Sequence, residues 1–178
     1  LKLKKIELEL GLITDCDIKS INGLSNLKNK NFIEKINTLH QTEFIFQDSL
    51  NLINILKENN KNIYLASSSK NASFILKKIN IFDAFKSIYD GNTIEQYNLK
   101  SKPFPDIFNF CIDRNNILAD DVVIFEDSIS GIEAALSSKS NLVIGLDRKK
   151  KLNKTEFKVP SCKSFGIVDN FSKLKINL

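Results

Sequence analysis

The chain has 178 residues, of which 42% are hydrophobic, and a formal net charge of +5. This length suits one domain with a modest insert, and the apolar content is enough for a core. No apolar run reaches the about 18 residues that cross a bilayer, so we expect no membrane partner. The basic residues are mostly scattered lysines without interleaved aromatics, and the densest run, residues 148–151, is typical of a solvated loop. We therefore expect no nucleic-acid partner.

Cysteine and histidine usage excludes several kinds of site. Cys16, Cys111 and Cys162 are odd in number and far apart, with no paired metal-ligand spacing. They indicate reduced thiols and a cytoplasmic location. His40, the single histidine, has no Ser or Cys partner that the sequence identifies for a hydrolase triad. The chain contains no Met and begins with Leu1, so we expect residues to precede it.

Strand-like and helix-like runs alternate along the chain. In chain order, they predict a strand at residues 6–10, helices at 32–39 and 48–60, a strand at 62–67, a helix at 74–82, a strand at 87–90, a helix at 105–112, a strand at 122–125, a helix at 130–136, and strands at 141–146 and 165–168. Asp48 with Ser49 is expected to cap its helix, and Pro105 to open the first turn of another. This order predicts an α/β fold, a parallel Rossmann-like sheet with helices on both faces. A polar insert with one helix is expected at about residues 16–46.

Polar groups follow three of the predicted strands, at the edge where α/β sheets bind ligands. The turn at residues 11–15 follows the first strand. The "SSS" at residues 67–69 places three hydroxyls between a strand and a helix. Hydroxyls and free backbone N–H groups at a helix start suit a phosphate, although simple helix capping by serine explains them as well.

Two adjacent acids, Glu126 and Asp127, end another predicted strand. A buried pair of carboxylates is costly unless a cation lies beside it, and oxygen ligands of this kind suit Mg²⁺. The alternative is that Asp127 caps the next helix and Glu126 points to water. Lys102 is followed by Pro103 and Pro105, which stiffen the backbone beside it. A lone lysine is nevertheless usually a surface residue.

Taken together, these residues resemble the haloacid dehalogenase-like superfamily, and within it the β-phosphoglucomutases and related sugar phosphatases. "LASSSKN" is similar to the superfamily's second motif, "SKPFPDIF" to its third and "FEDSISGIEAA" to its fourth, while "LKNKNFIEKI" is similar to part of the mutase cap. The phosphate- or substrate-binding residues that the resemblance implies are Ser67, Ser68, Ser69, Lys70, Asn71, Lys102 and Lys28. It implies that Glu126 and Asp127 hold Mg²⁺.

The resemblance implies a Mg²⁺-dependent phosphomutase or phosphatase that acts on a sugar phosphate or another small phosphorylated substrate. It also implies a single core domain over residues 1–178, with a truncated helical cap at about residues 16–44. We expect a monomer. Most of the superfamily's cap is missing, so water would reach the site, and hydrolysis or no reaction is more plausible than mutase chemistry.

The superfamily's first motif, Asp-x-Asp, is not found at its expected place before the turn. In ungapped register, Leu8 and Leu10 occupy the nucleophile and acid–base positions. A slip of one residue brings Glu7 and Glu9 to these positions as candidate catalytic acids, although they also suit the polar face of a strand. The literal Asp-x-Asp at residues 15–17 follows the turn. We therefore expect no mutase turnover and at most a trace of phosphatase activity.

Two other functions remain open on the sequence. One is a non-catalytic phosphate- or metal-binding relative, or the product of a decayed gene, which the leucines in the first motif favour. The other is a nucleotide-binding α/β module, which has less support because no glycine-rich loop follows a strand.

Overall fold

The computed structural model describes residues 21–38 and 45–174 of the chain. Contacts divide the chain into two units, Leu1–Phe44 and Ile45–Leu178, which are treated separately below. The described part of the first unit is one helix, α2 (Ile21–Thr38), which extends the helix predicted at residues 32–39. The strand predicted at residues 6–10 lies outside the described residues, and so do Glu7 and Glu9. Within the described residues, no helix is both long and apolar enough to cross a membrane.

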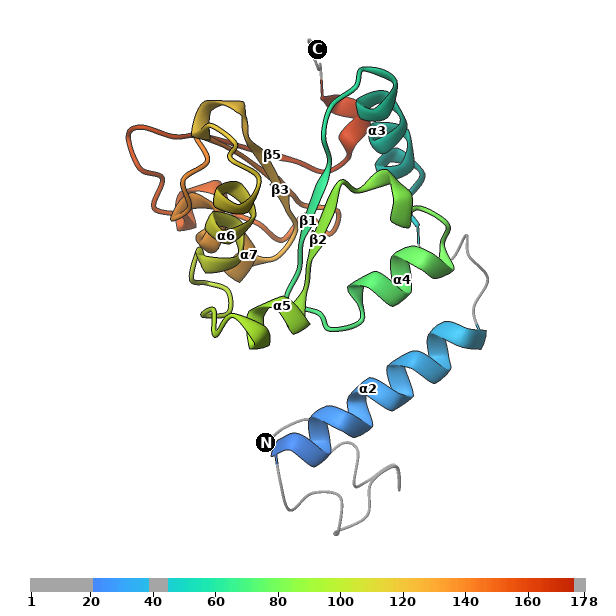
Figure 1. Cartoon of the computed structure of the whole chain (residues 1–178). Coiled ribbons are helices and arrows are strands. Elements are labelled where there is room, and N and C mark those ends of the chain that lie inside the picture. Colours follow the sequence, from blue (N-terminus) through green and yellow to red (C-terminus); the bar gives the residue numbers. More distant parts are fainter. Residues whose placement is uncertain (1–20, 39–44, 175–178) are drawn as a thin grey trace. The chain divides into compact units, whose positions relative to one another are not determined.

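The second unit alternates strands and helices as predicted (Figure 1). In chain order its helices and strands are α3 (Gln47–Glu58), β1 (Tyr64–Ala66), α4 (Ala72–Lys78), β2 (Ser87–Tyr89), α5 (Gly91–Gln96), α6 (Asp106–Arg114), β3 (Val123–Glu126), α7 (Ile129–Leu136), β4 (Leu142–Leu146) and β5 (Ser164–Val168). Short 3₁₀ turns lie between several of them. The predicted α/β class is confirmed.

All strand pairs are parallel, and they form two groups. β1 pairs with β2, and β4 lies between β3 and β5. Helix α4 lies in the crossover from β1 to β2 and α7 in that from β3 to β4, whereas the crossover from β4 to β5 carries only a short 3₁₀ turn. Parallel strands end at the same edge, so the residues that follow β1 and β3 can meet in one place.

The apolar core of this unit lies between α6, α7 and the β3–β4–β5 group. Ile107 of α6, Ile132 of α7 and Val143 of β4 are fully buried. Helical spacing explains the helix contributions, because Ile132, Ala135 and Leu136 share one face of α7. α6 and α7 are thereby fixed against the strands, and both begin next to strand ends that carry polar residues.

One predicted helix start is wrong and another is shifted by one residue. The residue before α3 is Phe46, which has no side chain that could cap the helix, and Asp48 lies within the first turn. Pro105 is the residue immediately before α6, one position earlier than predicted, and its carbonyl accepts from the Asn109 N–H at 3.0 Å in the first turn. The short helix α5 was not predicted, and its start is capped by Asp90, whose carboxylate accepts from the N–H groups of Asn92 and Thr93.

Asp48 instead forms a largely buried ion pair with Arg148. The guanidinium donates to Asp48 Oδ2 at 3.0 Å and to the Ser49 hydroxyl at 2.9 Å, and it lies 2.9 Å from Asp48 Oδ1 in the ion pair. The Phe171 N–H donates to the same carboxylate at 2.8 Å, and the Phe46 ring lies 3.9 Å from the guanidinium carbon. Burial raises the pKa of Asp48, but the hydrogen bonds from Arg148 and Phe171 outweigh it and hold the pKa below its usual value.

Candidate functional site

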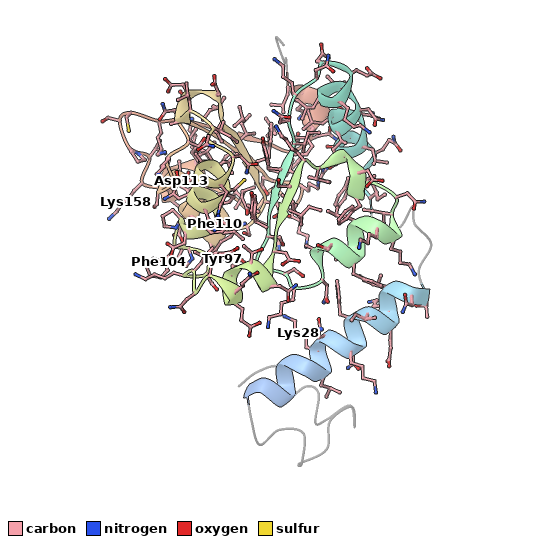
Figure 2. The ribbon with its side chains drawn as sticks, viewed as in Figure 1. Lys28, Tyr97, Phe104, Phe110, Asp113 and Lys158 are labelled. Atoms are coloured by element: carbon pink, nitrogen blue, oxygen red, sulfur yellow. The ribbon has the colours of Figure 1, made fainter. Side chains whose placement is uncertain are left out.

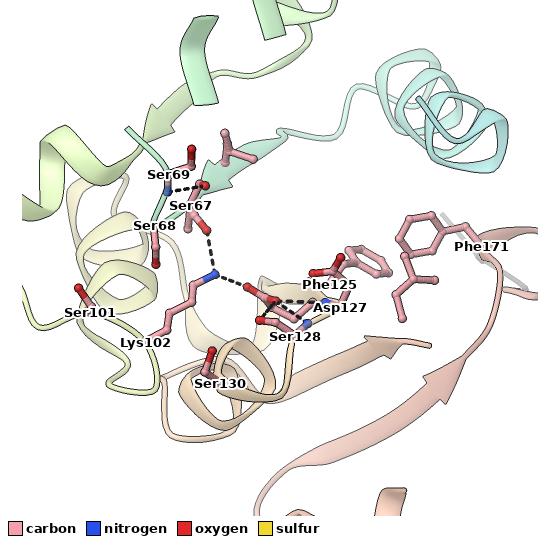
Figure 3. Close-up of a pocket in the computed structure, with 14 residues that line it drawn as sticks. Ser67, Ser68, Ser69, Ser101, Lys102, Phe125, Asp127, Ser128, Ser130 and Phe171 are labelled. Atoms are coloured by element: carbon pink, nitrogen blue, oxygen red, sulfur yellow. Dashed lines mark hydrogen bonds and ion pairs between the residues drawn. The ribbon is translucent and has the colours of Figure 1, made fainter. Parts of the chain in front are cut away.

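A pocket of about 610 Å³ lies at the carboxyl ends of β1, β3 and β4. It has a polar side formed by hydroxyls, a lysine and two carboxylates, and an apolar side of aliphatic and aromatic residues (Figure 3). The lining residues are Leu65, Ala66, Ser67, Ser68, Ser69, Ser101, Lys102, Phe125, Glu126, Asp127, Ser128, Ser130, Leu146 and Phe171. The structure therefore brings the serine loop, Lys102 and the two acids of the sequence prediction into one site.

The serine loop after β1 is closed by its own hydroxyls. Ser67 Oγ accepts from the Ser69 N–H at 3.1 Å, and Ser69 Oγ accepts from the Asn71 N–H at 3.2 Å. Helix α4 begins at Ala72, and no side chain caps it. The serines thus shape the loop and do not cap the helix, so the capping alternative does not explain them.

Helix α5 supports this loop from behind. The Gly91 N–H donates to the Ser69 carbonyl at 3.2 Å, and the Asn92 side chain donates to the Lys70 carbonyl at 3.2 Å. A Cβ at position 91 would lie 2.7 Å from the Ser68 carbonyl oxygen, so this close approach requires glycine. The loop is therefore held between its own turns and the start of α5.

Lys102 connects the ends of β1 and β3 (Figure 3). Its ammonium donates to the Ala66 carbonyl at 3.2 Å and forms a short ion pair with Glu126 Oε1. The two side chains are 11% and 10% exposed, so this lysine is not the surface residue of the alternative interpretation. The cation beside the adjacent acids is Lys102.

The Glu126 carboxylate is fully engaged. Its Oε2 accepts from the N–H groups of Asp127 and Ser128 at 3.1 and 3.4 Å and from the Ser128 hydroxyl at 3.2 Å. A Cβ at position 131 would overlap this carboxylate, so Gly131 lets it pack onto the start of α7. Glu126 therefore does not point to water, and its present role is to hold Lys102.

Asp127 is the exposed carboxylate of the site. Ser128 caps α7 by accepting from the Gly131 N–H, so the alternative that Asp127 caps this helix is wrong. Within the described residues, the Asp127 carboxylate has no hydrogen bond or ion pair that would occupy it, and no cluster of three potential metal-binding side chains is found. Mg²⁺ accepts one or two carboxylates completed by water and phosphate oxygens. Asp127 fits that donor set, whereas Glu126 would first have to leave Lys102.

Two other predicted residues do not line the pocket, and a third belongs to the first unit. Lys70 forms an exposed ion pair with Glu95 at 2.7 Å and does not line the pocket. Asn71 precedes α4 and is also absent from the pocket lining. Lys28 lies on α2 in the first unit, and its side chain is exposed.

Sequence reasoning missed the apolar side of the pocket and three of its serines, Ser101, Ser128 and Ser130. Phe125 and Phe171 contact each other edge to face with ring centroids 5.3 Å apart, and Leu146 lies beside them in the lining. No local pattern indicates that Phe171, near the end of the second unit, reaches this site. Ser128 could have been found, since it stands three residues before Gly131 at a helix start, where serine caps are common.

The parallel α/β sheet, with serines, a lysine and carboxylates at its strand ends, places the chain in the Rossmann-like class of α/β proteins. The sequence profile of the haloacid dehalogenase-like hydrolases matches residues 2–144, and the chain belongs to this family.

Its relatives include phosphomutases and phosphatases. The chain is 40% identical over 83 residues to a beta-phosphoglucomutase of Bacillus subtilis, covering 47% of this chain and 35% of that protein. It is 31% identical over 104 residues to a probable pseudouridine-5'-phosphatase of Saccharomyces cerevisiae, covering 53% and 44%. A beta-phosphoglucomutase structure from Clostridium difficile has the same fold, with a TM-score of 0.68, 24% identity, and coverage of 97% of this chain and 72% of that one. The chain spans less than half the length of the two sequence relatives.

Proposed function

We propose that the pocket binds the phosphate group of a sugar phosphate, or of another small phosphorylated substrate, as part of Mg²⁺-dependent phosphoryl transfer. The observation that carries this proposal is the position of Lys102. Its ammonium lies in a pocket between the serine loop after β1 and the acids after β3. Phosphoryl transfer depends mainly on alignment and charge neutralisation, and this arrangement supplies a cation and hydroxyls for both.

The donors around the pocket suit a phosphate. The ammonium has three N–H donors, of which the Ala66 carbonyl and Glu126 occupy two within the described residues. Ser67 and Ser68 line the same pocket with their hydroxyls and backbone groups. Charge-assisted hydrogen bonds to phosphate are about twice as strong as neutral ones, so Lys102 is expected to contribute most of the affinity.

Asp127 is the proposed Mg²⁺ ligand, and Glu126 joins it if the metal draws its carboxylate from Lys102. Bound Mg²⁺ supplies charge neutralisation at the phosphate oxygens. Calorimetry is expected to show weak Mg²⁺ binding that Asp127→Asn removes. Asp121→Asn, a change at an exposed acid outside the pocket, is expected to leave it unchanged. Tight Mg²⁺ binding that survives Asp127→Asn would contradict the assignment.

A second candidate, a non-catalytic phosphate-binding relative, is favoured by the leucines at the first-motif positions. Loss of a nucleophile costs about 10⁶-fold in a well-studied hydrolase. We therefore propose that the parent chain shows at most a trace of Mg²⁺-dependent hydrolysis and no mutase turnover.

Hydrolysis of a small aryl phosphate, which needs no cap, separates the two candidates. Leu8→Asp combined with Leu10→Asp is expected to create Mg²⁺-dependent hydrolysis and a trappable acyl-phosphate, whereas the parent stays at a trace. A parent that hydrolyses the ester and loses this activity in Glu7→Gln would assign catalysis to Glu7 and reject the ungapped register. Glu9→Gln tests the second acid of that register in the same way.

A further inference from the structure

Lys102 has a third contact, which comes from the hydrophobic core. Its ammonium nitrogen lies 4.6 Å from the centre of the Phe108 ring, over the ring face. Phe108 is on α6, is 6% exposed and belongs to the core cluster with Ile107 and Ile132. A cation over an aromatic face is attracted by the ring's quadrupole, and the attraction grows when the pair is shielded from water.

Unlike the other two contacts, the contact with the Phe108 ring does not occupy an N–H donor of the ammonium. The Ala66 carbonyl and the Glu126 carboxylate each take an N–H donor, and Glu126 carries the same sign of charge as a phosphate. A phosphate that approaches Lys102 therefore competes with Glu126. The ring attracts the charge without carrying a charge of its own, so it holds the ammonium in place whichever anion is bound.

The ring is also in a fixed position. Phe108 lies in the first turns of α6, whose buried face includes Ile107, Cys111 and Ile112. Burial raises the pKa of the Cys111 thiol to about 11, in agreement with an apolar setting on this face of the helix. A side chain packed into the core cannot follow the lysine, so it defines where the ammonium lies.

We propose that Phe108 is a positioning residue that holds the Lys102 ammonium at the pocket while its anionic partner changes. The part of this inference that concerns a phosphate ligand rests on the proposed function. The contact between ring and lysine does not, because it is formed in the chain as described.

The same helix offers a contrasting contact at the surface. Phe110 packs on Tyr97 with ring centroids 4.7 Å apart, and the Arg114 guanidinium carbon lies 5.1 Å from the Phe110 ring (Figure 2). These residues do not line the pocket. Phe110→Leu thus removes a cation–ring contact from α6 without touching Lys102.

The experiment compares Phe108→Leu with Phe108→Tyr, which keeps the ring, and with two controls. Phe165→Leu removes another buried ring that contacts Phe157, and Phe110→Leu removes the surface contact.

Orthovanadate affinity is measured by calorimetry and stability by urea unfolding. Phe108→Leu is expected to weaken orthovanadate binding about 5-fold, whereas Phe108→Tyr stays within about 2-fold of the parent. Phe165→Leu is expected to lose stability with unchanged affinity.

A spectroscopic measurement tests the contact itself. The Lys102 ε-methylene signal, assigned by its absence from Lys102→Gln, should lie upfield in the parent because of the ring. Phe108→Leu should move it downfield, and neither control should. An unmoved signal, or equal losses of affinity in Phe108→Leu and Phe165→Leu, would overturn the inference. If the parent fails to bind orthovanadate, the proposed function fails, and the Lys102 signal alone decides the role of Phe108.

Discussion

Two largely buried ion pairs stand at strand ends of the second unit, and they differ in what surrounds them. Arg148 donates a hydrogen bond to one Asp48 oxygen and forms an ion pair with the other, and further contacts come from the Ser49 hydroxyl, the Phe171 N–H and the Phe46 ring. Lys102 and Glu126 meet through a single ion pair at the edge of a pocket, beside the exposed Asp127.

The difference distinguishes a pair that stabilises the fold from a pair that lines the candidate site. The planar guanidinium matches a carboxylate bidentately, which suits a permanent contact between α3 and the loop after β4. An ammonium is a compact charge with three donors, and its contact with Glu126 can be exchanged for another anion. Burial of an ion pair therefore does not identify a candidate site, and neither does an adjoining pocket, because Arg148 lines a second one. The serine loop and the exposed Asp127 beside it distinguish the Lys102 pair.

Asp48→Ala is expected to produce the largest loss of stability in this comparison. It leaves the largely buried Arg148 without its partner, which typically costs about 3–5 kcal/mol of unfolding free energy. Urea unfolding measures the loss. Asp113→Ala is the control, because the Lys139–Asp113 pair is about half exposed and such pairs contribute below about 1 kcal/mol. Equal effects of the two changes would remove the distinction between the pairs.

The pH dependence of stability gives a second test of the Asp48 pair. Because its folded-state pKa is lowered, Asp48 stabilises the fold above its unfolded-state pKa of about 3.9. That contribution is lost as the pH falls below this value and through the lower folded-state pKa. The unfolding free energies of the parent and Asp48→Asn are therefore expected to converge as the pH falls below the unfolded-state pKa. A gap that stays constant with pH would show that Asp48 titrates normally.

Gly131→Ala is expected to cause an intermediate loss of stability, because it disturbs the Lys102–Glu126 ion pair. The new methyl group overlaps the Glu126 carboxylate, and strain of this kind costs about 1–3 kcal/mol. Displacement of Glu126 should also change phosphate affinity. Gly166→Ala is the matched control, because a Cβ there meets no atom within 4 Å. A Gly131→Ala variant as stable as Gly166→Ala would mean that Glu126 readily moves off α7.

Local sequence patterns predicted all five strands of the second unit, the serine loop and the two acids, and the motif resemblance added Lys102. Their side chains lie next to strand ends, and the parallel topology brings those ends together. The patterns failed where the deciding partner is distant in sequence. Asp48 resembles a helix cap until Arg148, 100 residues later, is seen beside it. Phe108 carries a helical core pattern, and its contact with Lys102 depends on the packing of α6.

The short helix α5 was missed for a different reason. Six residues provide too little periodicity to predict a helix. The adjacent Asp90 and Gly91 mark its start, but the same residues are common in turns. Their importance for the serine loop follows from one close approach, between Gly91 and the Ser68 carbonyl, which no sequence pattern indicates.

The central claim is that Lys102 binds phosphate at this pocket. Calorimetric titration with orthophosphate tests it directly in the parent, in Lys102→Ala and in Lys100→Ala, a matched change at an exposed lysine two residues earlier. Loss of a charged hydrogen bond of about 1.5–3 kcal/mol predicts that Lys102→Ala binds about 10–100-fold more weakly, while Lys100→Ala binds as the parent does. Equal affinity of the parent and Lys102→Ala would contradict the claim.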